Sequence, residues 1–380
     1  MKVLILWSGA VVPAYHQFFH ELAKYMQVRA LAPKRWTHGS ITFQNSCADQ
    51  ADDNSQKLSA ETRHPCEIIP VLYIPEASSR YFVPSLIFHL WVYRPRYLYI
   101  MDEMDRISLT WHALIAKLVW PTVKIICYSL QNLTEPSYYR WHHRLALRLN
   151  QKLVSRAIAA SQEAEHVLRG HGYQGATCVI PLWGAENFFH PGETLATQEI
   201  RKGLGVSPSA ITLLYCGGLV EAKGLGMLLE VLPHYPRIIL ITAGIGPLQE
   251  SLRKGLGDQW IDMGALEGDS LRKFYQAGDY IILPSLTLPH WKEQVGRSLI
   301  EGILSGCVAL GSDSGHIPEL TLFPETSFRQ GDSQALGKLL ESLPLPRSES
   351  IRLAQRQNVF KHFTASVVAS RTFHFLETGL

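Results

Sequence analysis

Residues 211–232 read ITLLYCGGLVEAKGLGMLLEVL, in which a strand pattern, two glycines and a helix pattern follow one another directly. The opening apolar run is typical of a parallel strand buried on both faces. After the glycines, leucines recur at the spacing of one helix face: Leu225, Leu228, Leu229 and Leu232. The stretch therefore predicts a strand, a tight turn and a covering helix, which is the repeating unit of a doubly wound α/β sheet.

The same alternation runs along the 380-residue chain. Its other strand patterns are KVLILW, VRALAP, YLYIMD, VKIICYSL, RAIAAS, RIILITAG, YIILPS and CVALGS, with helical patterns between them. The alternation is interrupted near IPLWGAENFFHPGET, where Pro, Gly and aromatic residues gather. We therefore expect an α/β protein with two Rossmann-like, doubly wound domains facing a central cleft, residues 1–182 and 183–358.

Composition describes an ordinary folded chain, with 46% hydrophobic and 18% charged residues. Six scattered cysteines without a CxxC pair suit thiols in a reducing cytoplasm. No stretch approaches the roughly 20 apolar residues of a membrane span. Residues 1–182 hold 19 Lys/Arg against 13 Asp/Glu, a net +6, whereas residues 183–380 hold 17 against 20, a net −3. This asymmetry predicts that the first half faces something anionic.

Glycines follow four strand ends of the second half, at Gly217 with Gly218, at Gly244, at Gly264 and at Gly296. The carboxyl ends of parallel strands meet at one edge of a sheet, where α/β proteins bind ligands. Lys223 stands close to the start of a helix, whose dipole favours anions. The motif is neither a P-loop nor GxGxxG, so a tight turn with a solvated lysine remains the alternative.

Residues 293–301 read EQVGRSLIE, with two acids around a glycine that can begin a helix. Amides at such a helix start can take a phosphate. Glu293, just before the helix, is placed to accept hydrogen bonds from sugar hydroxyls. Glu301, inside the helix, is placed to hold a ribose diol. The alternative is a surface loop with two unrelated acids.

These segments resemble the retaining glycosyltransferases of family 4, which have the glycosyltransferase-B (GT-B) fold. The resemblance rests on Glu293 and Glu301 with seven residues between them, on VALGSDSGHIPEL after them, and on GGLVEAKG, AGIGPL and YIILPS before them. It implies a hexosyltransferase that uses a nucleotide-diphosphate sugar without a metal ion or other cofactor. Residues 359–380 resemble the C-terminal helix that crosses back onto the first domain in that family.

The resemblance also assigns roles to single positions. Glu293 and Lys223 would be catalytic, Glu293 at the donor sugar and Lys223 at the departing diphosphate, and Glu301 would hold the ribose. Gly9 would be the close-approach glycine after the first strand. Further donor-binding positions are implied at the glycine turns and at the helix start: Gly217, Gly218, Gly244, Gly264, Val295, Gly296, Arg297 and Ser298.

Three positions depart from the family pattern. Gly218 stands where the family has an arginine, and Arg297 is a candidate substitute. The first-domain histidine is replaced near Gln131 and Asn132, and Glu186 lies in the turn between the domains. The first two departures keep open a catalytically degenerate relative that binds a nucleotide or a partner. A nucleotide-sugar epimerase of the same fold is a third possibility.

The acceptor is expected in the first domain. Asp102 and Glu103 end the YLYI strand on the cleft side, where they would orient an acceptor or cap the next helix. His16 follows Gly9 closely and is placed to touch an acceptor hydroxyl, as is Asn132. His16 and His20 also have a metal-ligand spacing, but no third ligand is apparent, so no metal site is expected.

Residues 138–156 carry a row of cations spaced four apart: Arg140, Arg144, Arg148, Lys152 and Arg156. On a helix this spacing keeps the row on one broad face. Tyr138, Tyr139 and Trp141 stand at its start. The pattern predicts contact with an anionic membrane at its inner face, and hence a lipid-linked or cell-surface glycan precursor as acceptor. The alternative is a solvated helix face, and no nucleic-acid-binding motif is present.

Overall fold

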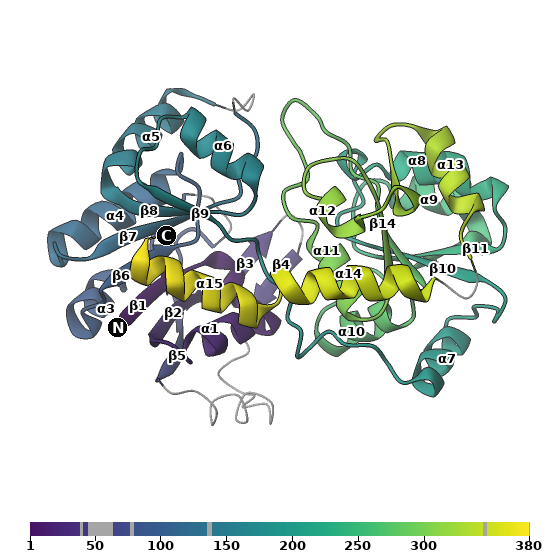
Figure 1. Ribbon diagram of the computed structural model, residues 1–380, viewed down its shortest axis with the longest axis horizontal. Coiled ribbons are helices and arrows are strands. Elements are labelled where there is room, and N and C mark those ends of the chain that lie inside the picture. The colour runs from purple at the N-terminus through teal and green to yellow at the C-terminus, as the bar shows by residue number, and fades with distance from the viewer. Residues whose placement is uncertain (39–40, 45–63, 77–79, 135–138, 345–347, 380) are drawn as a thin grey trace. The chain divides into compact units, whose positions relative to one another are not determined.

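The structure is a computed structural model that describes residues 1–38, 41–44, 64–76, 80–134, 139–344 and 348–379 (Figure 1). It divides into two compact units. Unit 1 comprises Met1–Leu182 and Ala365–Leu380, and unit 2 comprises Trp183–Thr364. Each unit contains one sheet whose strands are all parallel, so the predicted fold class of two Rossmann-like α/β domains is confirmed.

Unit 1 is built on a seven-stranded sheet in the order β5-β2-β1-β6-β7-β8-β9. Its strands are β1 (Lys2–Leu6), β2 (Gln27–Pro33), β5 (Cys66–Val71), β6 (Tyr97–Ile100), β7 (Lys124–Ser129), β8 (Val154–Ala159) and β9 (Ala176–Val179). The first strands run outward from β1 on one side and the later ones from β6 on the other. The strand order therefore reverses between β1 and β6, where both strands are almost fully buried.

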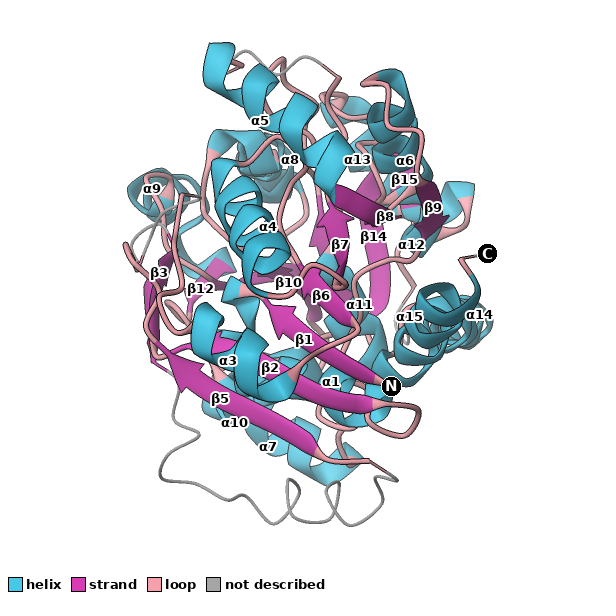
Figure 2. Cartoon of the chain, turned by 90° about the vertical axis from the view of Figure 1, so that its left-hand side faces the viewer, coloured by secondary structure: helices cyan, strands magenta, loops and turns pink. Residues whose placement is uncertain are grey.

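Helices cover this sheet, and Figure 2 shows α3, α4 and α5 toward the viewer. The helical segments of unit 1 are η1 (Ser8–Val11), η2 (Pro13–His16), α1 (Gln17–Leu22), α3 (Leu86–Tyr93), α4 (Ile107–Val119), α5 (Trp141–Leu153), α6 (Gln162–Gly170) and α15 (Ala365–Thr378). A hairpin of β3 (Arg35–His38) and β4 (Ile41–Gln44) is separate from the sheet. Among the described residues, no helix has both the length and the apolarity to cross a membrane.

Unit 2 has a six-stranded sheet in the order β12-β11-β10-β13-β14-β15. Its strands are β10 (Ile211–Cys216), β11 (Ile238–Ala243), β12 (Trp260–Asp262), β13 (Tyr280–Leu283), β14 (Val308–Ser312) and β15 (Ser327–Phe328). The order reverses between β10 and β13. The strands β12 and β15, like β3, β4, β5 and β9 in unit 1, were not among the predicted strand patterns. Strands β9, β12 and β15 have four residues or fewer, and β5 contains Glu67 and Pro70, which interrupt its apolar run.

The helical segments of unit 2 lie on both faces of its sheet. They are α7 (Thr194–Gly203), η4 (Glu221–Lys223), α8 (Leu225–Val231), η5 (Leu232–His234), α9 (Gln249–Leu256), η6 (Gly257–Gln259), α10 (Gly268–Gln276), α11 (Arg297–Leu304), α12 (Pro318–Thr321), η7 (Pro324–Thr326), α13 (Ser333–Glu341) and α14 (Glu349–His362). The single C-terminal helix expected over 359–380 is wrong. The segment is divided at Phe363–Thr364 between α14 and α15, and at the break the Phe363 carbonyl accepts a hydrogen bond from the Gly184 amide. Helix α15 packs on α1 of unit 1, where Tyr25 and Phe373 stack.

Candidate functional site

The strand-order reversal in unit 2 brings two loops together at the carboxyl edge of the sheet. Gly217 and Gly218 follow β10, and Pro284 and Ser285 follow β13. The Leu286 amide donates to the carbonyl oxygen of Ala222 over 2.9 Å, which ties η4 to the loop after β13. A reversal of this kind opens a crevice for ligands in α/β sheets.

An ion pair lies across these loops. The Lys223 Nζ atom is 2.6 Å from Oε2 of Glu293, and Ser285 Oγ donates to the same oxygen over 2.8 Å. Glu293 is 7% exposed and the Lys223 side chain 22%. The Lys223 ammonium also lies 4.7 Å from the ring centroid of Trp291, within the range of a cation–π contact. A cation and a carboxylate are thus held together, partly desolvated, at the edge where α/β sheets generally bind ligands.

The glycine turns after β10, β11 and β12 are neighbours. The Gly217 amide donates to the Ala243 carbonyl over 2.9 Å, and the Gly244 amide donates to the Gly264 carbonyl over 2.7 Å. Gly244 has a φ of 154°, and a Cβ added there would lie 1.9 Å from the Gly217 carbonyl oxygen. Gly218 is exposed, and its carbonyl accepts from the Tyr215 hydroxyl. The sequence therefore placed these glycines correctly along one edge, and their role in donor binding stays a prediction.

Helix α11 begins where the sequence pattern put it. Gly296 is its N-cap with a φ of 67°, and Val295 before it is buried. Arg297 and Ser298 form its first turn, and the amides of a first turn have no partner within their own helix. A Cβ added to Gly315 would lie 1.9 Å from the Glu293 carbonyl oxygen, so the loop after β14, which contains Gly315, packs directly on the segment before α11.

Glu301 lies deeper than the pattern suggested. It is 4% exposed, and its Oε2 accepts a hydrogen bond from the Tyr275 hydroxyl over 2.8 Å. Burial, with Glu301 nearby, raises the pKa of the Cys216 thiol to about 12. The hydrogen bond between Glu301 and Tyr275 therefore joins α11 to α10, and the predicted contact of Glu301 with a ribose stays a prediction.

In unit 1 the two predicted carboxylates lie beyond β6, at the other strand-order reversal. Glu103 accepts from Ser129 Oγ over 2.6 Å and from the amides of Leu130 and Gln131. Asp102 accepts from the Ser108 hydroxyl and from the Glu103 amide. Burial raises the pKa of Asp102 to about 6 and that of Glu103 to about 7. These hydrogen bonds tie Glu103 to the turn after β7, which continues into Asn132.

Two other predicted acceptor residues have roles within the fold. A Cβ at Gly9 would lie 2.4 Å from the ring of Trp7, so this glycine makes room for that ring. His16 is buried with Nε2 2.7 Å from the Ala10 carbonyl oxygen, and burial lowers its pKa to about 4. In the described part of the chain, no group of three or more His, Cys, Asp or Glu is arranged to hold a metal ion.

The predicted basic row is shorter than expected. Tyr138 lies outside the described residues, and α5 ends at Leu153. Arg156 belongs to β8 and donates to the carbonyls of Phe375 and Leu376, so its inclusion in the helical row is wrong. Strand β8 begins at Val154, directly after α5, so the helix ends before it reaches Arg156.

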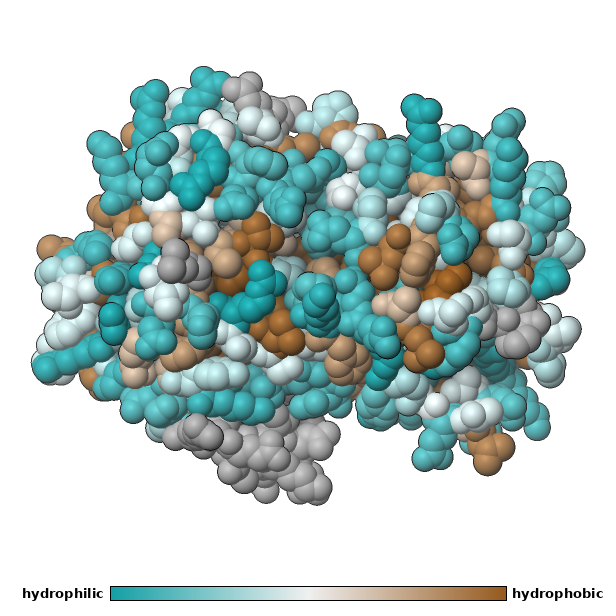
Figure 3. All heavy atoms as spheres, viewed as in Figure 1, coloured by the Kyte–Doolittle hydropathy of each residue, from teal (hydrophilic) through white to brown (hydrophobic). Residues whose placement is uncertain are grey.

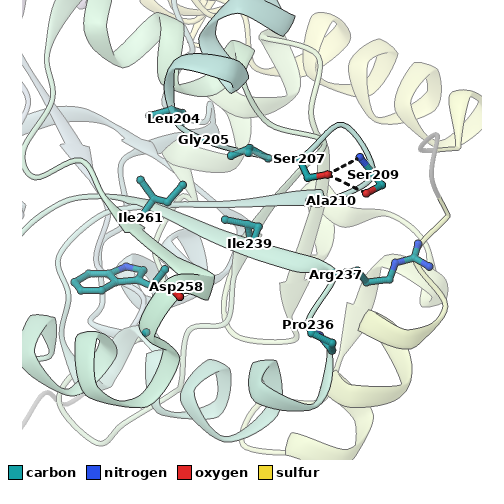
Figure 4. Close-up of a pocket in the computed structure, with 13 residues that line it drawn as sticks. Leu204, Gly205, Ser207, Ser209, Ala210, Pro236, Arg237, Ile239, Asp258 and Ile261 are labelled. Carbon is teal, nitrogen blue, oxygen red and sulfur yellow. Dashed lines mark hydrogen bonds between the residues drawn. The ribbon is translucent and has the colours of Figure 1, made fainter.

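A cavity of about 470 Å³ occurs at the opposite edge of the unit 2 sheet (Figure 4). It lies beside the amino-terminal ends of β10, β11 and β12, and its lining includes Ser207, Arg237 and Asp258. None of the predicted site residues lines it. Since α/β sheets bind ligands at the carboxyl ends of their strands, we assign the candidate site to the Lys223–Glu293 edge.

Three residues of the site were missed by sequence reasoning. Ser285 and Trp291 contact the Lys223–Glu293 pair, and Tyr275 contacts Glu301. Ser285 and Trp291 lie in the loop between β13 and Gly296. Their position in the loop that leads to the predicted helix start was the one sequence feature that could have identified them as site residues. Nothing in the sequence pattern of α10 distinguishes Tyr275 from a core residue.

Residues 210–343 match the family described as glycosyl transferases group 1. This range contains β10 to α13, together with Lys223, Glu293 and Glu301. Unit 2 therefore carries a glycosyltransferase group 1 domain.

Two curated relatives match part of the chain. A sulfoquinovosyl transferase of Arabidopsis thaliana is 28% identical over 152 residues, which are 38% of this chain and 29% of the relative. An uncharacterized glycosyltransferase of Methanocaldococcus jannaschii is 25% identical over 132 residues, 32% of each chain. The match thus spans less than a third of the length of either relative.

Solved structures match over the whole chain. HepE of Anabaena, solved in complex with UDP and glucose, has a TM-score of 0.71 at 16% identity and covers 100% of both chains. At this identity the likeness shows the fold, which is that of the GT-B glycosyltransferases.

Proposed function

We propose that the chain is a retaining glycosyltransferase that moves a sugar from a nucleoside-diphosphate sugar to an acceptor. The observation that carries the proposal is the Lys223–Glu293 ion pair at the carboxyl edge of unit 2. A departing diphosphate develops negative charge, and a preplaced cation beside helix-end amides stabilises that charge. Lys223 and the start of α11 supply both kinds of group.

UDP is the nucleotide we propose first, because HepE, which has the same fold, was solved with UDP and glucose. In this proposal Glu293 contacts the donor sugar, Glu301 the ribose, and Val295 to Ser298 the phosphates. No protein nucleophile is nominated: the acceptor attacks on the face that the diphosphate leaves, and a phosphate oxygen takes its proton. Metal independence is part of the proposal.

The acceptor side is proposed for unit 1, at the carboxyl ends of β1 and β6 with Asp102 and Glu103. We propose a lipid-linked or cell-surface glycan precursor as acceptor. Contact between α5 and the inner face of an anionic membrane is part of this proposal, and the exposed cations Arg144, Arg148 and Lys152 of α5 support it. The chain would then work in the cytoplasm, peripheral to the membrane.

A transfer assay tests the proposal. The purified chain is incubated with UDP-sugars and lipid-linked saccharide acceptors, with and without a chelator, and the anomeric configuration of the product is determined by NMR. We expect product with the donor's configuration, no effect of the chelator, and a loss of about 100-fold or more in Lys223→Met. The matched control is Lys254→Met, which removes an exposed lysine of unit 2.

The outcomes separate the rival functions. Nucleotide binding without transfer to any acceptor would favour the catalytically degenerate relative, for which the absence of a side chain at Gly218 is the supporting observation. Conversion of the donor sugar in the absence of acceptor would favour an epimerase.

A further inference from the structure

The outer faces of three neighbouring helices of unit 1 are apolar. Helix α4 packs between α3 and α5, and Figure 2 shows the three on one side of the unit. Of the eighteen large apolar residues that are exposed in the described ranges, ten lie on these helices. These ten, which we call the apolar face, are Ile87, Phe88, Trp91, Val92, Trp111, Leu114, Leu118, Trp141, Leu145 and Leu149.

Helix α3 shows the exposure of apolar residues most clearly, because its sequence LIFHLWVY is apolar on both sides. Leu86 and Leu90 are completely buried in the core, whereas Phe88 is 60% and Trp91 65% exposed. A helix that is hydrophobic all round is normally covered on every side. Contiguous exposed apolar surface on a folded protein marks an interaction site. In Figure 3 apolar side chains appear along the outer edge of unit 1, where α3 and α4 lie.

The charges of these helices have one sign. No Asp or Glu occurs in α3, α4 or α5. On α5, exposed Arg144, Arg148 and Lys152 are interleaved with the leucines of the apolar face, and exposed Arg94 follows α3. Each helix also presents one tryptophan of the apolar face. Tryptophans beside cations on an apolar surface match the interfacial region of an anionic bilayer.

We propose that the apolar face is a membrane-docking surface. Its side chains enter the interfacial region of an anionic bilayer while the cations of α5 contact lipid phosphates. The inference deepens the membrane contact of the proposed function, but it adds α3 and α4 and does not depend on sugar transfer. A second copy of the chain is a poorer occupant, because like cations would then face one another.

Vesicle co-sedimentation of the full chain tests the proposal, using phosphatidylcholine vesicles with and without phosphatidylglycerol. We expect binding that requires phosphatidylglycerol and survives in part at high salt, because inserted apolar groups are not screened. The Arg144→Gln/Arg148→Gln variant should bind about 30-fold more weakly, at about 1 kcal/mol per cation. Phe88→Ser/Trp91→Ser should lose more than about tenfold. Leu195→Ser is the matched control, an exposed apolar residue of unit 2 that should bind unchanged.

Since all substituted side chains are exposed, the circular dichroism spectrum and the affinity for UDP should be unchanged. Absence of vesicle binding, or equal binding by Phe88→Ser/Trp91→Ser and the unsubstituted chain, overturns the proposal. A dimer that Phe88→Ser/Trp91→Ser dissociates, with no vesicle binding, assigns the face to a second copy and overturns it too. Vesicle binding without binding of UDP, GDP, ADP or CDP would contradict the proposed sugar transfer alone.

Discussion

Lys223 and Glu293 are 70 residues apart in the chain, yet their charged atoms are 2.6 Å apart in the structure. The pair joins the turn after β10 to the loop before α11, on either side of the strand-order reversal of unit 2. The lysine that we assign to the diphosphate is thus paired with the acid that we assign to the sugar. When a diphosphate binds, it must therefore compete with the Glu293 carboxylate for the Lys223 ammonium.

This relationship predicts opposite effects of Glu293→Gln on binding and on transfer. The amide oxygen can still accept from Ser285, but the negative charge that competes with the diphosphate is removed. We expect UDP to bind about two- to tenfold more tightly, which is the effect of removing one partly exposed like charge. Transfer should fall by about 100-fold, because the sugar contact is weakened.

Calorimetry with UDP and a transfer assay on the same preparation measure the two effects. A weaker affinity for UDP in Glu293→Gln would show that the carboxylate helps to bind the diphosphate, contrary to this account.

Gly218 offers a gain-of-function test. The glycosyltransferases that the chain resembles have an arginine at this position, and a Cβ built on Gly218 has no neighbour within 4 Å. We expect Gly218→Arg to bind UDP about tenfold more tightly, since one charge-assisted hydrogen bond contributes about 1.5 kcal/mol. Gly218→Ala, which adds only the Cβ, should bind like the unsubstituted chain. Equal affinities of the two variants would mean that the diphosphate does not lie beside this turn.

Gly244→Ala should disturb the row of glycine turns. The added Cβ would meet the Gly217 carbonyl oxygen, and the φ of 154° disfavours any side chain. We expect the free energy of unfolding to fall by about 1–3 kcal/mol and UDP binding to weaken. Gly226→Ala in α8 is the control: its Cβ meets nothing within 4 Å, so stability should stay the same or rise slightly. Equal urea midpoints for the two variants would contradict the close approach of the turns.

The stability of unit 1 should depend on pH through His112. This residue is fully buried, its Nε2 accepts from the Val83 amide over 3.0 Å, and burial lowers its pKa to about 4. The unfolded chain takes up a proton below its ordinary pKa of about 6.5, whereas the folded chain does not until about 4. The contribution of His112 is therefore complete above pH 6.5 and is lost as the pH falls toward 4.

Other buried groups titrate in the same window, so a comparison with His112→Asn is needed. His16, whose pKa is also lowered, decreases the free energy of unfolding as the pH falls. Asp102 and Glu103, whose pKa values are raised, increase the free energy of unfolding as the pH falls. The difference in unfolding free energy between the two chains, from urea unfolding, should shrink by about 1.4 kcal/mol per pH unit between pH 6.5 and 4. A difference that is independent of pH would show that His112 is not buried as a neutral ring.

The sequence predicted the features that depend on local periodicity. Alternating strand and helix patterns identified the fold class, and the glycines at strand ends were correctly placed along one edge of the unit 2 sheet. The start of α11 at Gly296 was also correct, because a glycine before an amphipathic run is a local signal. The strands missed were β3 and β4, which form a separate antiparallel pair, and β5, β9, β12 and β15, which lie at the edges of the two sheets.

The sequence did not predict contacts between distant segments. Nothing in the spacing of Lys223 and Glu293 indicated that they pair, or that Glu301 is buried against Tyr275. The row of cations was extended to Arg156 because its four-residue spacing continues past the point where β8 begins. Likewise the apolar residues of α3 and α4 could have faced the core, and only the packing of the sheet shows that ten apolar side chains on α3, α4 and α5 face outward.

The central claim is that the Lys223–Glu293 edge of unit 2 binds a nucleoside diphosphate, and calorimetric titration of the full chain with UDP, GDP, ADP and CDP tests it most directly. The account predicts micromolar binding of one of them, UDP first, at about 8 kcal/mol. That binding should be weakened at least about tenfold in Lys223→Met and unchanged in Lys254→Met. Binding of none of the four, or equal binding by Lys223→Met and the unsubstituted chain, would contradict the assignment of the donor site.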